Sequence, residues 1–160
     1  MEFIMNKKVS TFLKCLVLPL AVGGLASLLT RGGMDVFATL NKPALSPPGW
    51  LFPVVWTILY LLMGAASYLV LTSGAPPQEI ASALKWYLLQ LAVNFFWPIF
   101  FFGFGWYLFS FLWLVVLWLL IVATIFAFRK VSVTAAYLLL PYLLWVTFAG
   151  YLNLFIYFRN

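Results

Sequence analysis

Residues Trp86–Phe128 read WYLLQLAVNFFWPIFFFGFGWYLFSFLWLVVLWLLIVATIFAF, 43 residues without a single charged side chain. A helix needs about 20 mostly apolar residues to cross the roughly 30 Å of hydrocarbon in a bilayer. The stretch is twice as long as one crossing requires, so it must fold back on itself. Gly103-Phe104-Gly105 is the expected hairpin, because glycine adopts the positive φ angles that turns use. Two membrane-spanning helices are therefore predicted, over 84–102 and 106–128.

Three further uncharged runs each predict one more span. The first extends from Cys15 to Thr30 and gains a turn if the Lys14 ammonium reaches the interface. Lys7 and Lys8 before this run also resemble a signal peptide, but no small-x-small cleavage site follows before the next charge. The spans are 11–29, 51–72 and 133–157. We thus expect an all-α membrane protein, a five-transmembrane-helix bundle forming a single integral domain over 1–160.

Composition excludes several other classes of protein. Hydrophobic residues make up 66% of the chain and charged residues 8%, with a mean hydropathy of +1.10. Soluble domains carry about 25% charged residues, so a soluble enzyme or a disordered segment is excluded. The nine cations are scattered rather than clustered, which excludes nucleic acid as a partner. One Cys, no His and three acidic residues allow no internal disulfide and no metal site, and we expect no cofactor.

The positive charges indicate how the chain is oriented. Five spans place the two termini on opposite sides of the membrane, and cytoplasmic loops carry an excess of Lys and Arg. Six cations fall on the side of the N-terminus and three on the other side, so we expect a cytoplasmic N-terminus. The first group is Lys7, Lys8, Lys14, Lys85, Arg129 and Lys130, and the second is Arg31, Lys42 and Arg159.

Tryptophan is unusually placed in three of the spans. Aromatic rings collect at the headgroup level of a bilayer, which explains the Trp residues near span ends. Trp56, Trp97 and Trp145 instead lie well inside their spans, each among residues at helical spacing. Aromatic packing between helices explains any one of these stripes, whereas three together favour a cavity for a flat apolar ligand. The stripes are Pro53, Trp56 and Tyr60; Gln90, Asn94, Trp97 and Phe101; and Pro141, Trp145, Ala149 and Asn153.

The segment 31–49 is expected to be a structured loop that covers one end of the bundle. Its 19 residues exceed the usual length of a connection, and long ordered loops are commonly lids or binding loops. Its Pro-Pro and Lys-Pro steps restrict the backbone. The spans themselves hold no acidic or basic group at bilayer depth, so ordinary acid–base catalysis and proton-coupled transport are not expected.

Three blocks of sequence resemble the translocator protein family (TspO/MBR), also called tryptophan-rich sensory proteins or peripheral-type benzodiazepine receptors. They are Asn41–Tyr60 (NKPALSPPGWLFPVVWTILY), Gln90–Gly103 (QLAVNFFWPIFFFG) and Pro141–Asn153 (PYLLWVTFAGYLN). The family pattern joins a K-P, P-P, W-x-F-P and W-x-x-L-Y block to an N-x-x-W block and a P-Y-x-x-W block ending in L-N. The resemblance implies a five-helix bundle, usually dimeric, with a lidded pocket, here in a bacterial cell membrane.

The resemblance also implies ligands and pocket residues. The family binds porphyrins such as protoporphyrin IX and synthetic drugs, and some animal members bind cholesterol. Phe37 stands where the family often has Tyr preceded by Trp. A sterol motif of the Leu-x-Tyr-x-Arg kind can be placed at Leu154, Tyr157 and Arg159. Carried over by motif, the ligand-binding residues are Phe37, Pro47, Trp56, Tyr60, Asn94, Trp97, Trp145, Ala149 and Leu152.

Three functions remain open from the sequence. The leading one is a membrane receptor, sensor or transporter-like protein for porphyrins and other flat apolar molecules. The second is an enzyme-like, light-dependent porphyrin degradation in which Trp56 and Trp145 are oxidised. The third is a structural subunit without a ligand. In each case we expect a homodimer, because small residues let helices approach closely in lipid. The candidate contacts are Gly23, Gly24, Ser27, Gly103 and Gly105.

Overall fold

The computed structural model describes residues 1–160, and its five membrane-spanning segments are all helical. No strand is present, so the all-α prediction is confirmed. The helices are α1 (Glu2–Thr30), α2 (Gly33–Thr39), α3 (Leu51–Leu71), α4 (Pro77–Pro98), a π-helical turn η1 (Ile99–Gly103), α5 (Tyr107–Arg129), α6 (Val133–Leu138) and α7 (Leu140–Arg159). Each of the five segments is long and apolar enough to cross a membrane, and the chain is an integral membrane protein.

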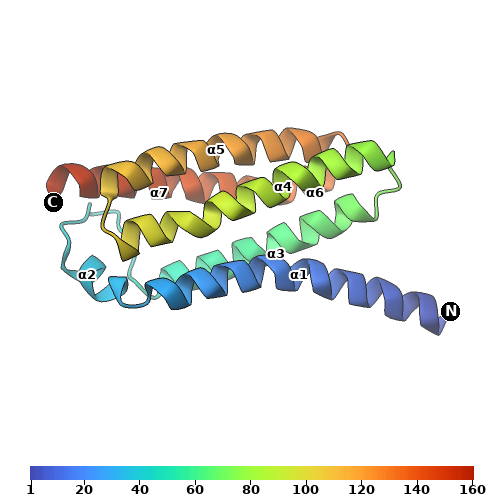
Figure 1. Ribbon diagram of the computed structural model, residues 1–160, viewed down its shortest axis with the longest axis horizontal. Helices are drawn as coiled ribbons and strands as arrows, with labels where there is room; N and C mark the ends of the chain where they lie inside the picture. The colour runs from blue at the N-terminus through green and yellow to red at the C-terminus, as the bar shows by residue number, and fades with distance from the viewer.

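The spans lie roughly antiparallel in one bundle, with the two termini at opposite ends (Figure 1). Helix α1 packs against α3 and α4, helix α5 packs against α4 and against α6 and α7, and α3 contacts α6. The short helix α2 and the connection to α3 cover the end of the bundle that also holds the end of α7 (Figure 1). This arrangement leaves a space between α1, α3, α4 and α7 beneath that cover.

The backbones of α1 and α3 approach each other closely because Gly64 on α3 has no side chain to hold them apart. A Cβ atom on Gly64 would lie 2.6 Å from the carbonyl oxygen of Cys15 and 2.7 Å from the Cα atom of Leu16. Further along, the rings of Phe12 and Tyr68 pack edge to face at 5.1 Å. In lipid the hydrophobic effect does not drive helices together, so such close packing holds the bundle.

Several span boundaries differ from the prediction. Helix α1 begins at Glu2 rather than at residue 11, and α4 begins at Pro77 rather than at 84. The first half of α1 extends beyond its neighbours and is largely exposed (Figure 1). A helix continues past the hydrocarbon into the interface, where charged side chains carry no penalty, so the absence of charge marks the bilayer crossing rather than the helix.

Two segments differ from the structure expected of them. The loop 31–49 contains helix α2, which the proline-rich sequence did not predict. The last span is interrupted at Leu139, between α6 and α7, because Pro141 near the start of α7 has no N–H to bond to the preceding turn. Ser132 caps α6, its hydroxyl oxygen accepting a hydrogen bond from the backbone N–H of Ala135 at 3.2 Å.

The predicted hairpin after the third span is present. Helix α4 ends in the wider turn η1, and the backbone N–H of Phe104 bonds to the carbonyl of Ile99 at 3.0 Å. Gly105 has a φ angle of 66°, which a residue with a side chain rarely adopts. The chain then reverses into α5, as the uncharged run of twice the spanning length requires.

Candidate ligand-binding cavity

A cavity of about 410 Å³ lies between α1, α3, α4 and α7, beneath α2 and the loop that follows it. Its volume is within the range of sites that bind small molecules, roughly 300–1,000 Å³. Three indoles from three different helices line it: Trp56 of α3, Trp97 of α4 and Trp145 of α7. The sequence predicted this convergence from the three stripes, and the folded chain brings them to one place.

A chain of buried hydrogen bonds closes the deep end of the cavity. The Tyr60 hydroxyl donates to Asn94 Oδ1 at 3.0 Å, and Asn94 Nδ2 donates to the Tyr142 hydroxyl at 2.7 Å. Tyr142 in turn donates to Gln90 Oε1 at 2.7 Å. Both ends of the Asn94 amide are therefore bonded to side chains of other helices, so this amide fixes the wall of the cavity.

The three indoles differ in what holds them. Trp97 Nε1 donates to Asn153 Oδ1 at 3.1 Å, and its ring stacks on Phe101 at 5.3 Å. Trp56 stacks on Tyr60 at 5.6 Å with an angle of 28° between the rings. Trp145 Nε1 is buried and has no hydrogen-bond partner in the protein. A buried donor without a partner is costly, so this N–H is an unsatisfied group within the Trp145 wall of the cavity.

Six of the nine residues expected to bind a ligand line this cavity, and three do not. Phe37 is buried among the rings of Phe52 and two other phenylalanines at 5.5–6.2 Å, so it anchors α2 to the bundle. Leu152 is buried between helices, and Pro47 is half-buried in the loop. The six lining residues are Trp56, Tyr60, Asn94, Trp97, Trp145 and Ala149.

Helix α1 supplies a wall that the sequence reasoning missed. Gly23, Gly24, Ser27 and Thr30 line the cavity, as Phe52 does from α3. A Cβ atom on Gly23 would collide with the Tyr60 ring, so this glycine lets α1 approach α3 within one chain. The sequence suggested Gly23 as a contact with a second copy of the chain. In the structure Gly23 packs inside the bundle and is not free for that contact.

Two of the three cations at the loop end, Lys42 and Arg31, differ in their surroundings. Lys42 Nζ donates to the carbonyl oxygens of Phe37, Ala38 and Leu40 at 2.9–3.2 Å, which satisfies the last carbonyls of α2. Lys42 is therefore engaged in holding α2. Arg31 lines the rim of the cavity, is exposed and makes no ion pair, so it is the cation placed to meet an acidic group on a ligand.

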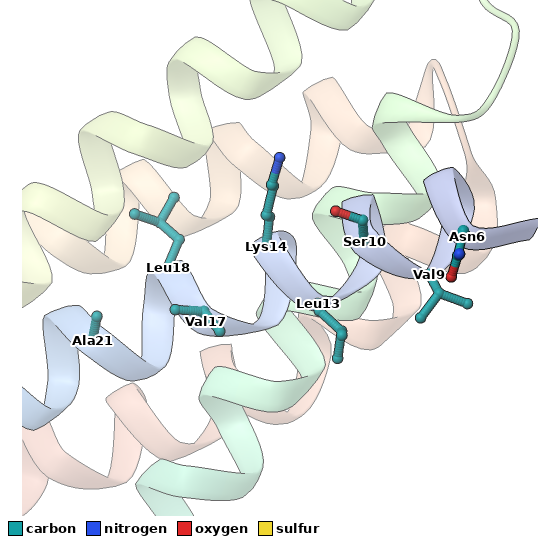
Figure 2. Close-up of a pocket in the computed structure, with 8 residues that line it drawn as sticks. All are labelled: Asn6, Val9, Ser10, Leu13, Lys14, Val17, Leu18 and Ala21. Atoms are coloured by element: carbon teal, nitrogen blue, oxygen red, sulfur yellow. The ribbon is translucent and has the colours of Figure 1, made fainter. Parts of the chain in front are cut away.

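A second concave surface runs along the first half of α1. All of its lining side chains belong to that helix, and Figure 2 shows them pointing in different directions rather than towards a common centre. A single helix cannot enclose a ligand, so this surface is not the candidate site. The residues are Asn6, Val9, Ser10, Leu13, Lys14, Val17, Leu18 and Ala21. The chain also holds no cluster of His, Cys, Asp or Glu that could bind a metal ion.

Comparison with known proteins identifies the family. The model of the TspO/MBR family matches residues 15–159. The tryptophan-rich protein TspO of Chlorobaculum tepidum is 43% identical over 150 residues, covering 93% of this chain and 95% of that protein. The translocator protein of Bos taurus is 40% identical over 142 residues, covering 86% and 82%. The tryptophan-rich sensory protein of Cereibacter sphaeroides is 39% identical over 117 residues, covering 73% and 72%.

The names of these relatives describe translocator and sensory proteins rather than enzymes. The match extends from within α1 to the last residues of α7, so it includes every helix that lines the cavity. The resemblance found in the three sequence blocks is confirmed, and the chain belongs to the TspO/MBR family of membrane sensor and translocator proteins.

Proposed function

We propose that this chain binds porphyrins, or other flat molecules that are mostly apolar, in the cavity between α1, α3, α4 and α7. The observation that carries the proposal is the meeting of three indoles from three helices around one cavity. Indole faces stack on flat rings. Binding would serve a membrane receptor, sensor or transporter-like function.

The rim of the cavity suits the acidic edge of a porphyrin. Arg31 is exposed at the rim, and Met34 and Gly49 complete the side formed by the loop. A guanidinium binds a carboxylate through two parallel hydrogen bonds, which orients the ligand as well as attracting it. The apolar macrocycle would then lie against the indoles while its propionates stay beside Arg31.

Titration with protoporphyrin IX tests the proposal. We expect Trp56→Phe and Trp145→Phe each to weaken binding by about 0.5–1.5 kcal/mol, because a phenyl ring keeps part of the stacking surface. Trp118→Phe is the control, since Trp118 is on α5, outside the cavity, and donates to Thr147. Equal binding by all variants, or a loss confined to Trp118→Phe, would place the ligand elsewhere.

The same titration separates the two alternatives. If the chain degrades porphyrin in light, the two Phe variants bind in the dark but lose the light-dependent disappearance of porphyrin, because a benzene ring is much harder to oxidise than indole. The stack of Trp56 on Tyr60 is the contact that favours this second function. If the chain is only a structural subunit, purified protein binds no porphyrin in the dark or in light.

We further infer a cytoplasmic N-terminus. By the order of the helices, six cations fall towards the side of the N-terminus and three towards the side of the loop. A reporter fused after Asn160 and one inserted at Gly103–Gly105 should both lie outside the cytoplasm, whereas one inserted at Gly74 should lie inside. The reverse pattern would show that the positive-inside rule fails for these short loops.

The homodimer and the binding of a sterol-like molecule remain predictions. For the dimer, Gly103 and Gly105 are exposed, while Gly23 packs against α3 and Gly24 lines the cavity. For a sterol, Tyr157 and Arg159 lie at the end of α7, where the membrane interface alone would favour both residue types.

A further inference from the structure

We propose that the cavity exchanges its ligand directly with the bilayer, through a lateral opening between α1 and α3. The lateral opening is defined by Gly24 and Ser27 of α1 and by Pro53 and Thr57 of α3. The inference rests on the proposed function, because it concerns how a mostly apolar ligand reaches the cavity. Under this inference the ligand enters the cavity from the bilayer rather than from water.

The cavity wall changes from buried to exposed at these four residues of α1 and α3 and, at the loop end, at Arg31 and Gly49. On the far side, Tyr60, Asn94 and Trp97 are 9%, 3% and 8% exposed. Gly24, Ser27, Pro53 and Thr57 line the same cavity and are also exposed on the outside of the bundle. Residues that belong both to a cavity wall and to the outer surface mark the place where the cavity reaches that surface.

The outer surface around the lateral opening faces lipid. Leu25 and Leu28 on α1 are 52% and 65% exposed, and Val54 and Ile58 on α3 are 47% and 51% exposed. Large apolar side chains beside the opening are suited to acyl chains rather than to water. An apolar molecule dissolved in the bilayer therefore meets the opening without crossing an aqueous layer.

The packing of α1 on α3 explains why the helices separate here. Towards the N-terminal end of α1, Gly64 brings the two backbones together, and at Gly23 the Tyr60 ring fills the gap. Beyond Gly23 the exposed lining residues of α1 and α3 are Gly24, Ser27, Pro53 and Thr57, none of which has a long side chain. The Thr57 hydroxyl is also turned back to the carbonyl of Pro53 at 2.7 Å. These four side chains are too short to close the wall.

The depth of the lateral opening suits an amphiphile. Gly24 and Ser27 lie six and three residues before Thr30, where α1 ends, and Pro53 and Thr57 lie two and six residues after the start of α3. At 1.5 Å per residue the opening is about 3–9 Å below the helix ends. A ligand with acidic groups can keep them at the headgroups, near Arg31, while its apolar body enters.

The loop end of the cavity is a poorer route. The backbone N–H of Asn41 donates to Asn160 Oδ1 at 2.9 Å, and Asn160 Nδ2 donates to the carbonyl of Asn41 at 3.0 Å. Phe37 is 6% exposed and packs among three other rings. These contacts hold the loop over the bundle, so on this side the cavity meets water at the rim beside Arg31 and Gly49. An apolar ligand must cross water to reach that rim, whereas it reaches the lateral opening directly from lipid.

Binding kinetics in phosphatidylcholine vesicles test the inference, with protoporphyrin IX as the probe and its fluorescence as the signal. The variant is Gly24→Leu combined with Thr57→Leu, which adds bulk on both sides of the opening. A Cβ atom on Gly24 meets nothing within 4 Å, so a side chain at this position starts in open space. We expect the association rate to fall by about tenfold, a barrier increase of about 1.4 kcal/mol. Gly24 and Thr57 also line the cavity, so Kd is measured separately and the association rate is the readout of the opening.

Two controls accompany this variant. Ala21→Leu adds the same bulk to an exposed site on α1 that does not line the cavity, and it should leave the association rate unchanged. Asn160→Ala removes both side-chain bonds to Asn41 and should also leave it unchanged. Porphyrin binding with an unaltered association rate in Gly24→Leu/Thr57→Leu, or faster association in Asn160→Ala, would overturn the lateral opening alone. Absence of porphyrin binding to the unmodified chain would overturn the proposed function, and this inference with it.

Discussion

Replacing Gly64 by alanine is expected to destabilise the bundle by about 1–3 kcal/mol, the usual cost of forcing extra atoms into a packed core. The added methyl group would lie 2.6 Å from the Cys15 carbonyl oxygen and 2.7 Å from the Leu16 Cα atom. Both of these are backbone atoms, so no rotamer change relieves the contact and α1 must move away from α3. The midpoint of thermal unfolding in detergent measures the loss.

Gly24→Ala on the facing helix is the matched control. Gly24 also lies within a membrane-spanning helix, but a Cβ atom there meets nothing within 4 Å. Alanine is the better helix former by about 1 kcal/mol, so this substitution should leave the midpoint unchanged or raise it. If Gly64→Ala also raised the midpoint, helix propensity would outweigh packing and the close approach of α1 to α3 would not be needed.

The number and nature of the spans could be predicted because hydrocarbon excludes charge. Helix boundaries could not, since α1 and α4 continue into the interface with Lys7, Lys8 and Lys85 on them. Helix α2 was missed for a different reason. Its seven residues carry no strong helix signal, and it is held by tertiary contacts: the Phe37 ring among three others and the Lys42 ammonium on its last carbonyls.

The walls of the candidate site that consist of large side chains at helical spacing could be predicted from the sequence. Each tryptophan stripe gave one wall of the cavity, because residues three and four apart share a helix face. The wall formed by α1 consists of small residues, whose pattern is the same whether they line a cavity or meet another helix. Phe37 and Leu152 were placed at the site by resemblance to the family, but they pack behind it.

Asn153→Leu is expected to destabilise the bundle by about 2–4 kcal/mol, since hydrogen bonds between membrane helices each contribute about 0.6–1.7 kcal/mol and this amide makes three. Asn153 Oδ1 accepts from Trp97 Nε1 and from the Ser110 hydroxyl, both at 3.1 Å, and Nδ2 donates to the Tyr107 carbonyl at 2.7 Å. One amide on α7 thus joins α4 to α5. Leucine has the same branching and the same number of side-chain heavy atoms as asparagine, so the variant leaves no cavity in place of the polar contacts.

A double-mutant cycle with Ser110→Ala separates this explanation from a general effect of repacking. Ser110 is 0% exposed, and its hydroxyl has a second acceptor in the Tyr107 carbonyl at 3.0 Å. Alone, Ser110→Ala should therefore cost less than Asn153→Leu, about 0.6 kcal/mol. In the Asn153→Leu background it should cost less still, because the amide partner is already gone, giving a coupling energy of at least about 0.5 kcal/mol. Strictly additive losses would mean that the side chains of Asn153 and Ser110 act independently. The Asn153 amide would then not be the link between α4, α5 and α7 that also orients Trp97 in the cavity wall.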